Sequence, residues 1–400
     1  MENAKMFDKG SYENALKYMD RYLQKKHLKK VSKKWGFKNT TKLMDMFEDI
    51  IRSVQVGVID GDDFRGWLSK SQIDGNNHHF VFEGEFIDVN ELKFQQLINN
   101  MNQNTESILD INEENLTETK LIYVFKLEHK YVLAFLSPAE ITVRQNLEDG
   151  SFRYNQEKVV YPAYLEFDFK HNNIIVVLNP TSNLSHVNGI QPGGRQNNFA
   201  SIADFFLEQA RGIVGSFHVR KPVWLPNALF NLAEDLSYHN NPEVEQLSLK
   251  MEDSIKKFSQ NLMEQSGISD IALVDSLSSE IQDSYISALQ EEFGENNSDD
   301  TYRVFMQKTD QASTSVAVES KVDNLTSGVV GRIAKQSRQD SDVKMIGLEV
   351  KLDEKTMYRF RIEDGPDHIL IRPSNRFTEE EVVQNVLSKL RQYKDGIPNR

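Results

Sequence analysis

Residues 119–179 constrain the fold more than any other part of the chain, because strand-like runs and turns alternate along them. Two runs rich in β-branched and aromatic residues flank positions 128–130, and two more flank positions 170–173. Another turn, at 148–150, separates the two pairs. Short turns of this kind join neighbouring antiparallel strands. The segment therefore predicts an antiparallel β-meander.

The segment before the meander begins with helices over residues 11–55, interrupted at 35–39. One apolar stripe ends at Leu23 and a second, on a different side of the helical wheel, begins at Leu28. A straight helix cannot bury both stripes against one surface, so we predict a break near residues 24–27. The apolar residues of the next helix recur at three- and four-residue spacing. These residues are Leu43, Phe47, Ile50, Ile51 and Val54.

The chain after the meander changes character twice. A long polar loop leads to a helix at about 199–215, and the helical pattern then continues to residue 293. Residues 294–300 are polar throughout, which predicts a linker. The last hundred residues have the order strand, strand, helix, three strands, helix. The closing helix, 378–394, has acids in its first turn and bases in its last, as the helix dipole favours.

These patterns predict a multi-domain α+β protein, because 400 residues exceed what one hydrophobic core usually serves. A content of 39% hydrophobic residues indicates a globular chain. The predicted parts are an N-terminal mainly helical region with a basic helix (1–118), an antiparallel meander (119–198) that can join it in one domain, an acidic all-helical middle (199–293), the linker (294–300), and a C-terminal α+β domain (301–400) with a three-strand meander and a closing helix.

Composition excludes several classes of site and location. The chain has no cysteine, so it has no disulfide, thiolate metal site or cysteine nucleophile, which suits a reducing compartment. Its first ten residues lack the apolar core of a signal peptide. No run approaches the roughly 20 apolar residues of a membrane span. We therefore expect a cytoplasmic protein, without a membrane partner.

Positive charge is concentrated in one short segment of an acidic chain. Residues 21–42 contain nine Lys or Arg and no acid, although the formal net charge of the chain is −13. Such a block, with aromatic residues among the cations, is typical of a surface that binds an anionic partner, most often nucleic acid. The candidate phosphate contacts are Lys25, Lys26, Lys29, Lys30, Lys33, Lys34, Lys38 and Lys42.

The preferred prediction is a DNA- or RNA-binding protein that contacts the phosphate backbone without reading sequence. Reading in the major groove is not favoured, because the helix that follows the block carries Asp45, Glu48 and Asp49, which phosphates would repel. From the composition and the uneven charge we further predict that the protein is a component of a bacterial anti-phage defence or mobile-element system. The competing interpretation is a solvated helix face, or a face paired with the acidic residues of 241–300 in the same chain or a second copy.

The C-terminal meander contains a second set of basic residues. In the run 356–362, Tyr358, Phe360 and Ile362 share one face, so Arg359 and Arg361 point to the other. Arg372 alternates in the same way with apolar neighbours in the next run. Such a face can follow a nucleic-acid backbone, but ordinary alternation between a buried and an exposed face explains the arginines as well.

Two further functions remain open from the sequence. Asp310, Glu319 and Lys321 have the residue types of a Mg²⁺-dependent nuclease, although three common residues at loose spacing often occur by chance. A scaffold or adaptor would instead assemble through the acidic helices of 241–293, with a partner or as a homo-oligomer. Apart from Mg²⁺ in the nuclease alternative, no cofactor is expected. The nine histidines include no HExxH pair, so the sequence predicts no zinc site.

Overall fold

The computed structural model describes residues 9–37, 42–104, 107–147, 150–193, 198–237, 242–293, 301–311, 314–320, 325, 328–353 and 356–397. These residues form helices and antiparallel sheet, which confirms the α+β class. The chain divides into two compact units. The first comprises Met1–Pro222 and Gly365–Gln384, and the second comprises Val223–Asp364 and Asn385–Arg400. The five-part division expected from the sequence stays a prediction.

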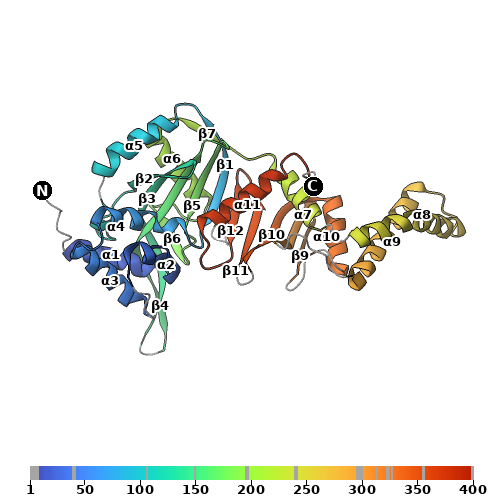
Figure 1. The fold of residues 1–400 in the computed structure, drawn as a ribbon, viewed down its shortest axis with the longest axis horizontal. Coiled ribbons are helices and arrows are strands. Elements are labelled where there is room, and N and C mark those ends of the chain that lie inside the picture. Colours follow the sequence, from blue (N-terminus) through green and yellow to red (C-terminus); the bar gives the residue numbers. More distant parts are fainter. Residues whose placement is uncertain are drawn as a thin grey trace. The chain divides into compact units, whose positions relative to one another are not determined.

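The first unit is built on an antiparallel sheet (Figure 1). Its strands lie in the order β2-β3-β4-β5-β1-β12, with β6 paired to β3 and β7 to β1. The predicted meander is confirmed, because β2 to β5 are neighbours in sequence order. The bounds are β1 (His78–Phe86), β2 (Lys120–Leu127), β3 (Lys130–Asn146), β4 (Phe152–Asp168), β5 (Asn173–Leu178), β6 (Leu184–Val187), β7 (Phe217–Arg220) and β12 (Ile369–Pro373).

Strand β12 joins this sheet from a distant part of the sequence. It pairs antiparallel with β1, so that His79 lies opposite Ile371 and Val81 lies opposite Ile369. The sequence pattern placed this strand in a C-terminal domain together with the two strands before it. That pattern does not show the pairing with β1, and residues 365–384 belong to the first unit.

One face of the first unit's sheet carries the large apolar core. Tyr131, Leu133 and Phe135 of β3 point into this core, where they meet residues of α6 (Ala200–Val214) such as Phe206. Helix α5 (Glu91–Asn104) adds Phe94, whose ring stacks on Tyr131 at 5.1 Å. Because side chains alternate along a strand, Lys130 and the other even-numbered residues of β3 face the opposite side.

The N-terminal helices cover that opposite side. They are α1 (Lys9–Tyr22), α2 (Lys25–Trp35), α3 (Leu43–Gln55) and α4 (Gly61–Lys70), followed by the 3₁₀ turn η1 (Ser71–Ile73). A second 3₁₀ turn, η2 (Ile108–Asp110), follows α5. Tyr164 of β4 ties them to the sheet, since its hydroxyl donates to the carbonyl of Ser69 and accepts from the N–H of Gln72. Figure 1 shows these helices grouped beside the sheet.

The predicted break in the first helical segment is confirmed between α1 and α2. Gln24 caps α2 with an extended backbone (φ −114°, ψ 162°), and its N–H donates to Nδ1 of His27 at 2.9 Å. The Nε2 atom of His27 lies 3.2 Å from the carbonyl oxygen of Asp74. Burial lowers the pKa of His27, which favours the neutral ring that this arrangement requires. Gly36 ends α2 in the left-handed conformation (φ 70°).

The second unit combines an antiparallel sheet with four helices of its own. Its strands lie in the order β11-β10-β8-β9. The bounds are α7 (Leu225–Ser237), α8 (Pro242–Gln265), α9 (Ile271–Phe293), β8 (Tyr302–Gln311), β9 (Thr314–Glu319), α10 (Gly328–Asp340), β10 (Asp342–Asp353) and β11 (Thr356–Asp364). Helix α11 (Glu380–Gln392) follows β12. The element order predicted for the last hundred residues is confirmed. None of the helices in the described ranges has the length and apolar character needed to cross a membrane.

Candidate functional site

Helix α2 presents its lysines to solvent. Leu28 and Val31 are buried and anchor the helix, and the ring of Trp35 packs edge-on against Trp67 at 5.1 Å. All six lysines of the helix are exposed. We call the six exposed lysines of this helix the lysine face: Lys25, Lys26, Lys29, Lys30, Lys33 and Lys34. Of the two other candidates, Lys42 is exposed and Lys38 lies outside the described residues.

Part of the lysine face is engaged by neighbouring side chains. The Nζ atom of Lys30 lies 2.5 Å from Oδ2 of Asp74, and that of Lys34 lies 2.7 Å from Oδ2 of Asp63. Lys26 lies over the ring of Phe377 at 5.2 Å. The two paired lysines remain 47% and 57% exposed, and ion pairs this open contribute only about 0.2–1 kcal/mol each. A phosphate can therefore compete for both lysines.

The C-terminal arginines have different surroundings. Arg359 forms an ion pair with the buried carboxylate of Glu349, which Arg303 also contacts from the neighbouring strand. Arg361 is exposed, as the alternation predicts, while Tyr358 and Phe360 are buried. Arg372 lies on β12 in the first unit and is partly buried. The contacts of Arg359 support a structural role for it, and phosphate binding by these arginines stays a prediction.

The structure does not bring the predicted nuclease residues together. Asp310 lies on β8 and Glu319 on β9, and the residue opposite Glu319 is Met306 rather than Asp310. Four residues of strand separate the two carboxylates, or about 13 Å at about 3.3 Å per residue. One Mg²⁺ ion cannot bridge that distance. Lys321 lies outside the described residues, and the nuclease alternative stays a prediction.

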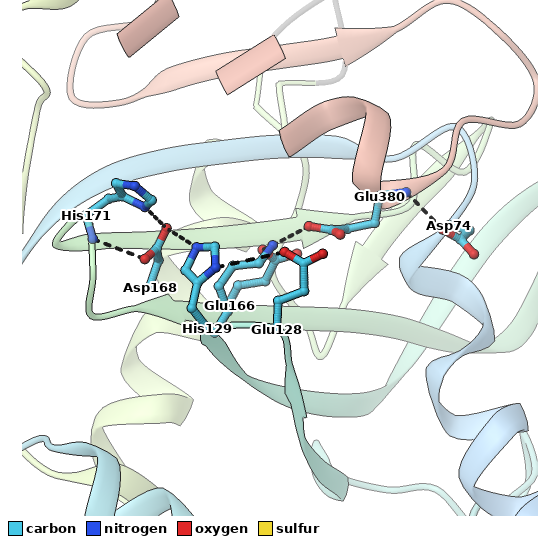
Figure 2. Close-up of polar contacts among 8 residues, drawn as sticks. Asp74, Glu128, His129, Glu166, Asp168, His171 and Glu380 are labelled. Atoms are coloured by element: carbon cyan, nitrogen blue, oxygen red, sulfur yellow. Dashed lines mark hydrogen bonds and ion pairs between the residues drawn. The ribbon is translucent and has the colours of Figure 1, made fainter. Parts of the chain in front are cut away.

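Another group of polar residues gathers at one end of the meander in the first unit (Figure 2). Lys130 begins β3 opposite Asp168, the last residue of β4. The turn that precedes Lys130 therefore lies beside the turn that follows Asp168. His129 comes from the first turn and His171 from the second, and both point toward Asp168 (Figure 2). We call His129, Asp168 and His171 the histidine–aspartate cluster.

The histidine–aspartate cluster has close contacts around a buried carboxylate. The Oδ2 atom of Asp168 lies 2.7 Å from Nδ1 of His171 and 3.4 Å from Nε2 of His129. Its Oδ1 atom accepts the backbone N–H of His171 at 3.1 Å, which holds the turn in place. The two imidazole rings meet edge to face at 5.3 Å. The Asp168 side chain is 0% exposed, whereas those of His129 and His171 are 36% and 29% exposed.

Next to the cluster lies a buried ion network, the Lys130 triad, formed by Lys130, Glu166 and Glu380. The Nζ atom of Lys130 donates to Oε2 of Glu166 at 2.7 Å and also to Glu380, at the start of α11. Burial disfavours the charged ammonium, but the two carboxylates outweigh it and the pKa of Lys130 is raised. Burial and the charge of Glu166 raise the pKa of Glu380. The triad thus joins β3, β4 and α11.

Two neighbours of the triad extend this polar layer. Asp74 accepts the backbone N–H of Glu380 at 2.9 Å and so caps α11 from a distant segment. Burial, followed by the charge of Lys130, lowers the pKa of His79 to about 3, so its ring is neutral near neutral pH. The meander end therefore combines solvent-accessible imidazoles with a buried charged support.

Sequence reasoning missed this group, because it looked for histidines at fixed spacing along one helix. His129 and His171 are 42 positions apart in the sequence. The signal that could have found it was the meander itself, in which the first and third turns lie at the same end of the strands. Each of those turns contains a histidine.

A scan against models of known protein families finds no match, and a search of curated protein sequences finds no similar protein. Function is therefore inferred from the residues and their geometry.

Proposed function

We propose that the protein binds nucleic acid through the lysine face, by contacts to the phosphate backbone and without sequence preference. The observation that carries the proposal is the exposure of all six lysines on one short helix. Leu28 and Val31 are buried, so the lysine face is the side of the helix that a partner can reach. Six such contacts would give a steep salt dependence, with a slope of roughly −0.9 per phosphate on duplex DNA.

The cytoplasmic location and the membership in a bacterial anti-phage or mobile-element system belong to the same proposal. A neighbouring gene for a helicase or nuclease would support the system assignment.

Charge reversal on the lysine face is expected to remove binding. The double variant Lys29→Glu/Lys33→Glu should flatten the salt slope by about 2 and weaken binding at about 0.1 M salt by one to two orders of magnitude. Reversal of all six lysines should abolish binding to duplex DNA. The measurement is fluorescence anisotropy with labelled duplex DNA, single-stranded DNA and RNA across a salt series. The nucleic acid that binds most tightly identifies the preferred partner.

The matched control is Lys250→Glu/Lys257→Glu, which changes the net charge equally at two exposed positions of α8. It should bind as the unaltered protein does. Equal losses in both double variants would assign the effect to net charge rather than to the lysine face. Unchanged binding after reversal of all six lysines would refute the proposal.

A second candidate function, assembly through the acidic helices, has one specific observation in its favour. Helix α8 exposes a row of large apolar side chains at helical spacing. Met251, Phe258 and Leu262 are 38%, 54% and 40% exposed. Four-helix bundles pack around apolar faces of this kind, so the occupant we propose is a second copy of the chain.

Phe258→Glu is expected to shift a dimer to a monomer, because it places a charge in the centre of the proposed contact. The measurement is light scattering after size exclusion, at low salt and at about 0.5 M salt. Glu252→Gln, at an exposed position of the same helix, is the control and should leave the dimer intact. A monomeric unaltered protein at both salt concentrations would exclude assembly through this face.

A further inference from the structure

The histidine–aspartate cluster has the donor set and the arrangement of a metal site. One ligand atom from each of His129, Asp168 and His171 can be chosen so that all three lie within 4.8 Å of one another. The cluster combines two imidazoles with a carboxylate that is withdrawn from solvent. We propose that these three residues bind one divalent transition-metal ion of the zinc class.

An unsatisfied nitrogen supports the proposal independently of the spacing. The Nε2 atom of His129 is shielded from solvent and has no hydrogen-bond partner within the described part of the chain. It lies 3.4 Å from Oδ2 of Asp168. A buried polar atom without a partner is unfavourable by about 1–3 kcal/mol, so such atoms usually have a function or an additional ligand. A metal ion between His129 and Asp168 would satisfy this nitrogen.

One of the two distances around Asp168 already fits such an ion. Zinc binds imidazole nitrogen and carboxylate oxygen at about 2.0–2.2 Å, which in tetrahedral geometry places neighbouring ligand atoms about 3.3–3.6 Å apart. The two nitrogens lie 2.7 Å and 3.4 Å from Oδ2 of Asp168. A small outward rotation of the His171 ring, with an unprotonated Nδ1 atom facing the ion, would complete the site.

The donor types select the class of metal. Imidazole suits zinc, copper, nickel and iron, whereas magnesium and calcium prefer oxygen ligands. Three protein ligands leave at least one coordination position open, as in catalytic rather than structural zinc sites.

Neighbouring residues support the ligands. Oε2 of Glu128 lies 3.9 Å from Nδ1 of His129, the ring nitrogen that would not bind the metal. Carboxylates that accept a hydrogen bond from the second ring nitrogen commonly orient metal-bound histidines, and Glu128 would have to move closer to do so. Glu128 itself has a left-handed backbone (φ 53°), which is unfavourable for a residue with a Cβ. Strained backbone of this kind persists where the surrounding structure imposes it, often at functional sites.

The test is metal binding by the full chain, prepared without a histidine tag and stripped with a chelator. Calorimetry with Zn²⁺ should give one ion per chain, and Co²⁺ should give the visible absorption of a site with nitrogen ligands. His129→Ala and His171→Ala should each weaken Zn²⁺ binding at least about 100-fold. Both side chains lie in turns and are partly exposed, so we expect these variants to fold. Thermal unfolding without metal would verify that.

The control is His186→Ala, because the Nε2 atom of His186 lies 3.3 Å from a carboxylate oxygen of Glu140, outside the cluster. It should bind Zn²⁺ as the unaltered protein does. Failure of the unaltered chain to bind one Zn²⁺ or Co²⁺ would overturn the proposal, and so would equal binding by the double variant His129→Ala/His171→Ala. Metal binding and nucleic-acid binding have separate readouts, so either proposal can fail without the other.

Discussion

Lys130→Met is expected to destabilise the first unit by about 3–5 kcal/mol near pH 8. The side chain of Lys130 is 1% exposed, and its ammonium group is held by Glu166 and Glu380. Methionine has a similar length but no charge, so the substitution leaves two buried carboxylates without their cation. The loss of one partner from a buried network is therefore far more damaging than the loss of a surface ion pair.

The effect of Lys130→Met should depend on pH in a defined direction. In the unaltered protein, burial and Glu166 raise the pKa of Glu380 from 4.5 to about 7. A carboxyl group with a raised pKa contributes stability that is fully present below pH 4.5 and is lost as the pH rises through about 7. Without Lys130 the pKa of Glu380 rises further. The variant should therefore lose more stability at pH 8 than at pH 5.

Urea unfolding at pH 5 and pH 8 would measure both effects. The control is Lys126→Met, since Lys126 is 49% exposed and its Nζ atom lies 4.0 Å from a carboxylate oxygen of Glu91. That change should lower the free energy of unfolding by less than about 1 kcal/mol. The triple variant Lys130→Met/Glu166→Leu/Glu380→Leu removes all three charges and should recover most of the lost stability. A triple variant as unstable as Lys130→Met would show that shape, not charge, governs this site.

Local periodicity explains what the sequence predicted correctly. The break before α2 follows from two apolar stripes that one helix cannot bury together. The meander follows from turns at regular intervals, and the exposed arginine at position 361 follows from two-residue alternation. In each case the physical cause lies within a few neighbouring residues, so one sequence is sufficient.

Non-local pairing explains what the sequence did not show. Strand β12 joins β1 across nearly 300 residues, and no local pattern specifies that choice. Likewise, nothing near Glu349 reveals that Arg303 and Arg359 both reach it, because the register of three strands decides it. The Lys130 triad depends on three separate segments in the same way. Its main sequence signal is a lysine directly before the apolar run 131–136.

The histidine–aspartate cluster could be predicted in part, because it depends on both local turns and strand register. The sequence predicted a meander with turns near residues 128–130 and 170–173, and each turn contains a histidine. What was missing was the register that places Lys130 opposite Asp168. With that register, His129 and His171 must lie beside each other. A predicted meander can therefore be used to search for sites among its alternate turns.

Arg338→Met is expected to destabilise the second unit by about 3 kcal/mol or more. Arg338 is 3% exposed and lies on α10, where its Nε donates to Glu234 of α7 at 2.7 Å. Its Nη1 donates to Oε1 of Gln307 at 2.7 Å. Gln307 of β8 is fully buried, and its Nε2 donates to the carbonyl of Ala334 at 3.0 Å. One guanidinium group thus links two helices to the sheet.

The expected loss has two physical parts. Without Arg338, the Oε1 atom of Gln307 loses a charged donor, which costs about 1–3 kcal/mol for a buried acceptor. Glu234 loses its cation, but its side chain is 15% exposed, so water can solvate part of the charge. We therefore expect a slightly smaller loss of stability than for Lys130→Met. Lys130 is paired with two carboxylates, and both are more deeply buried than that of Glu234.

Chemical unfolding, together with hydrogen exchange of the α10 and β8 amides, would measure the loss. Arg338→Lys keeps a charge near Glu234 but cannot form both bonds with the same geometry, so its stability should lie between those of the unaltered protein and Arg338→Met. Arg361→Met removes an exposed arginine from the same unit and should change the free energy of unfolding by less than about 0.5 kcal/mol. Equal effects of Arg338→Met and Arg361→Met would contradict the buried link.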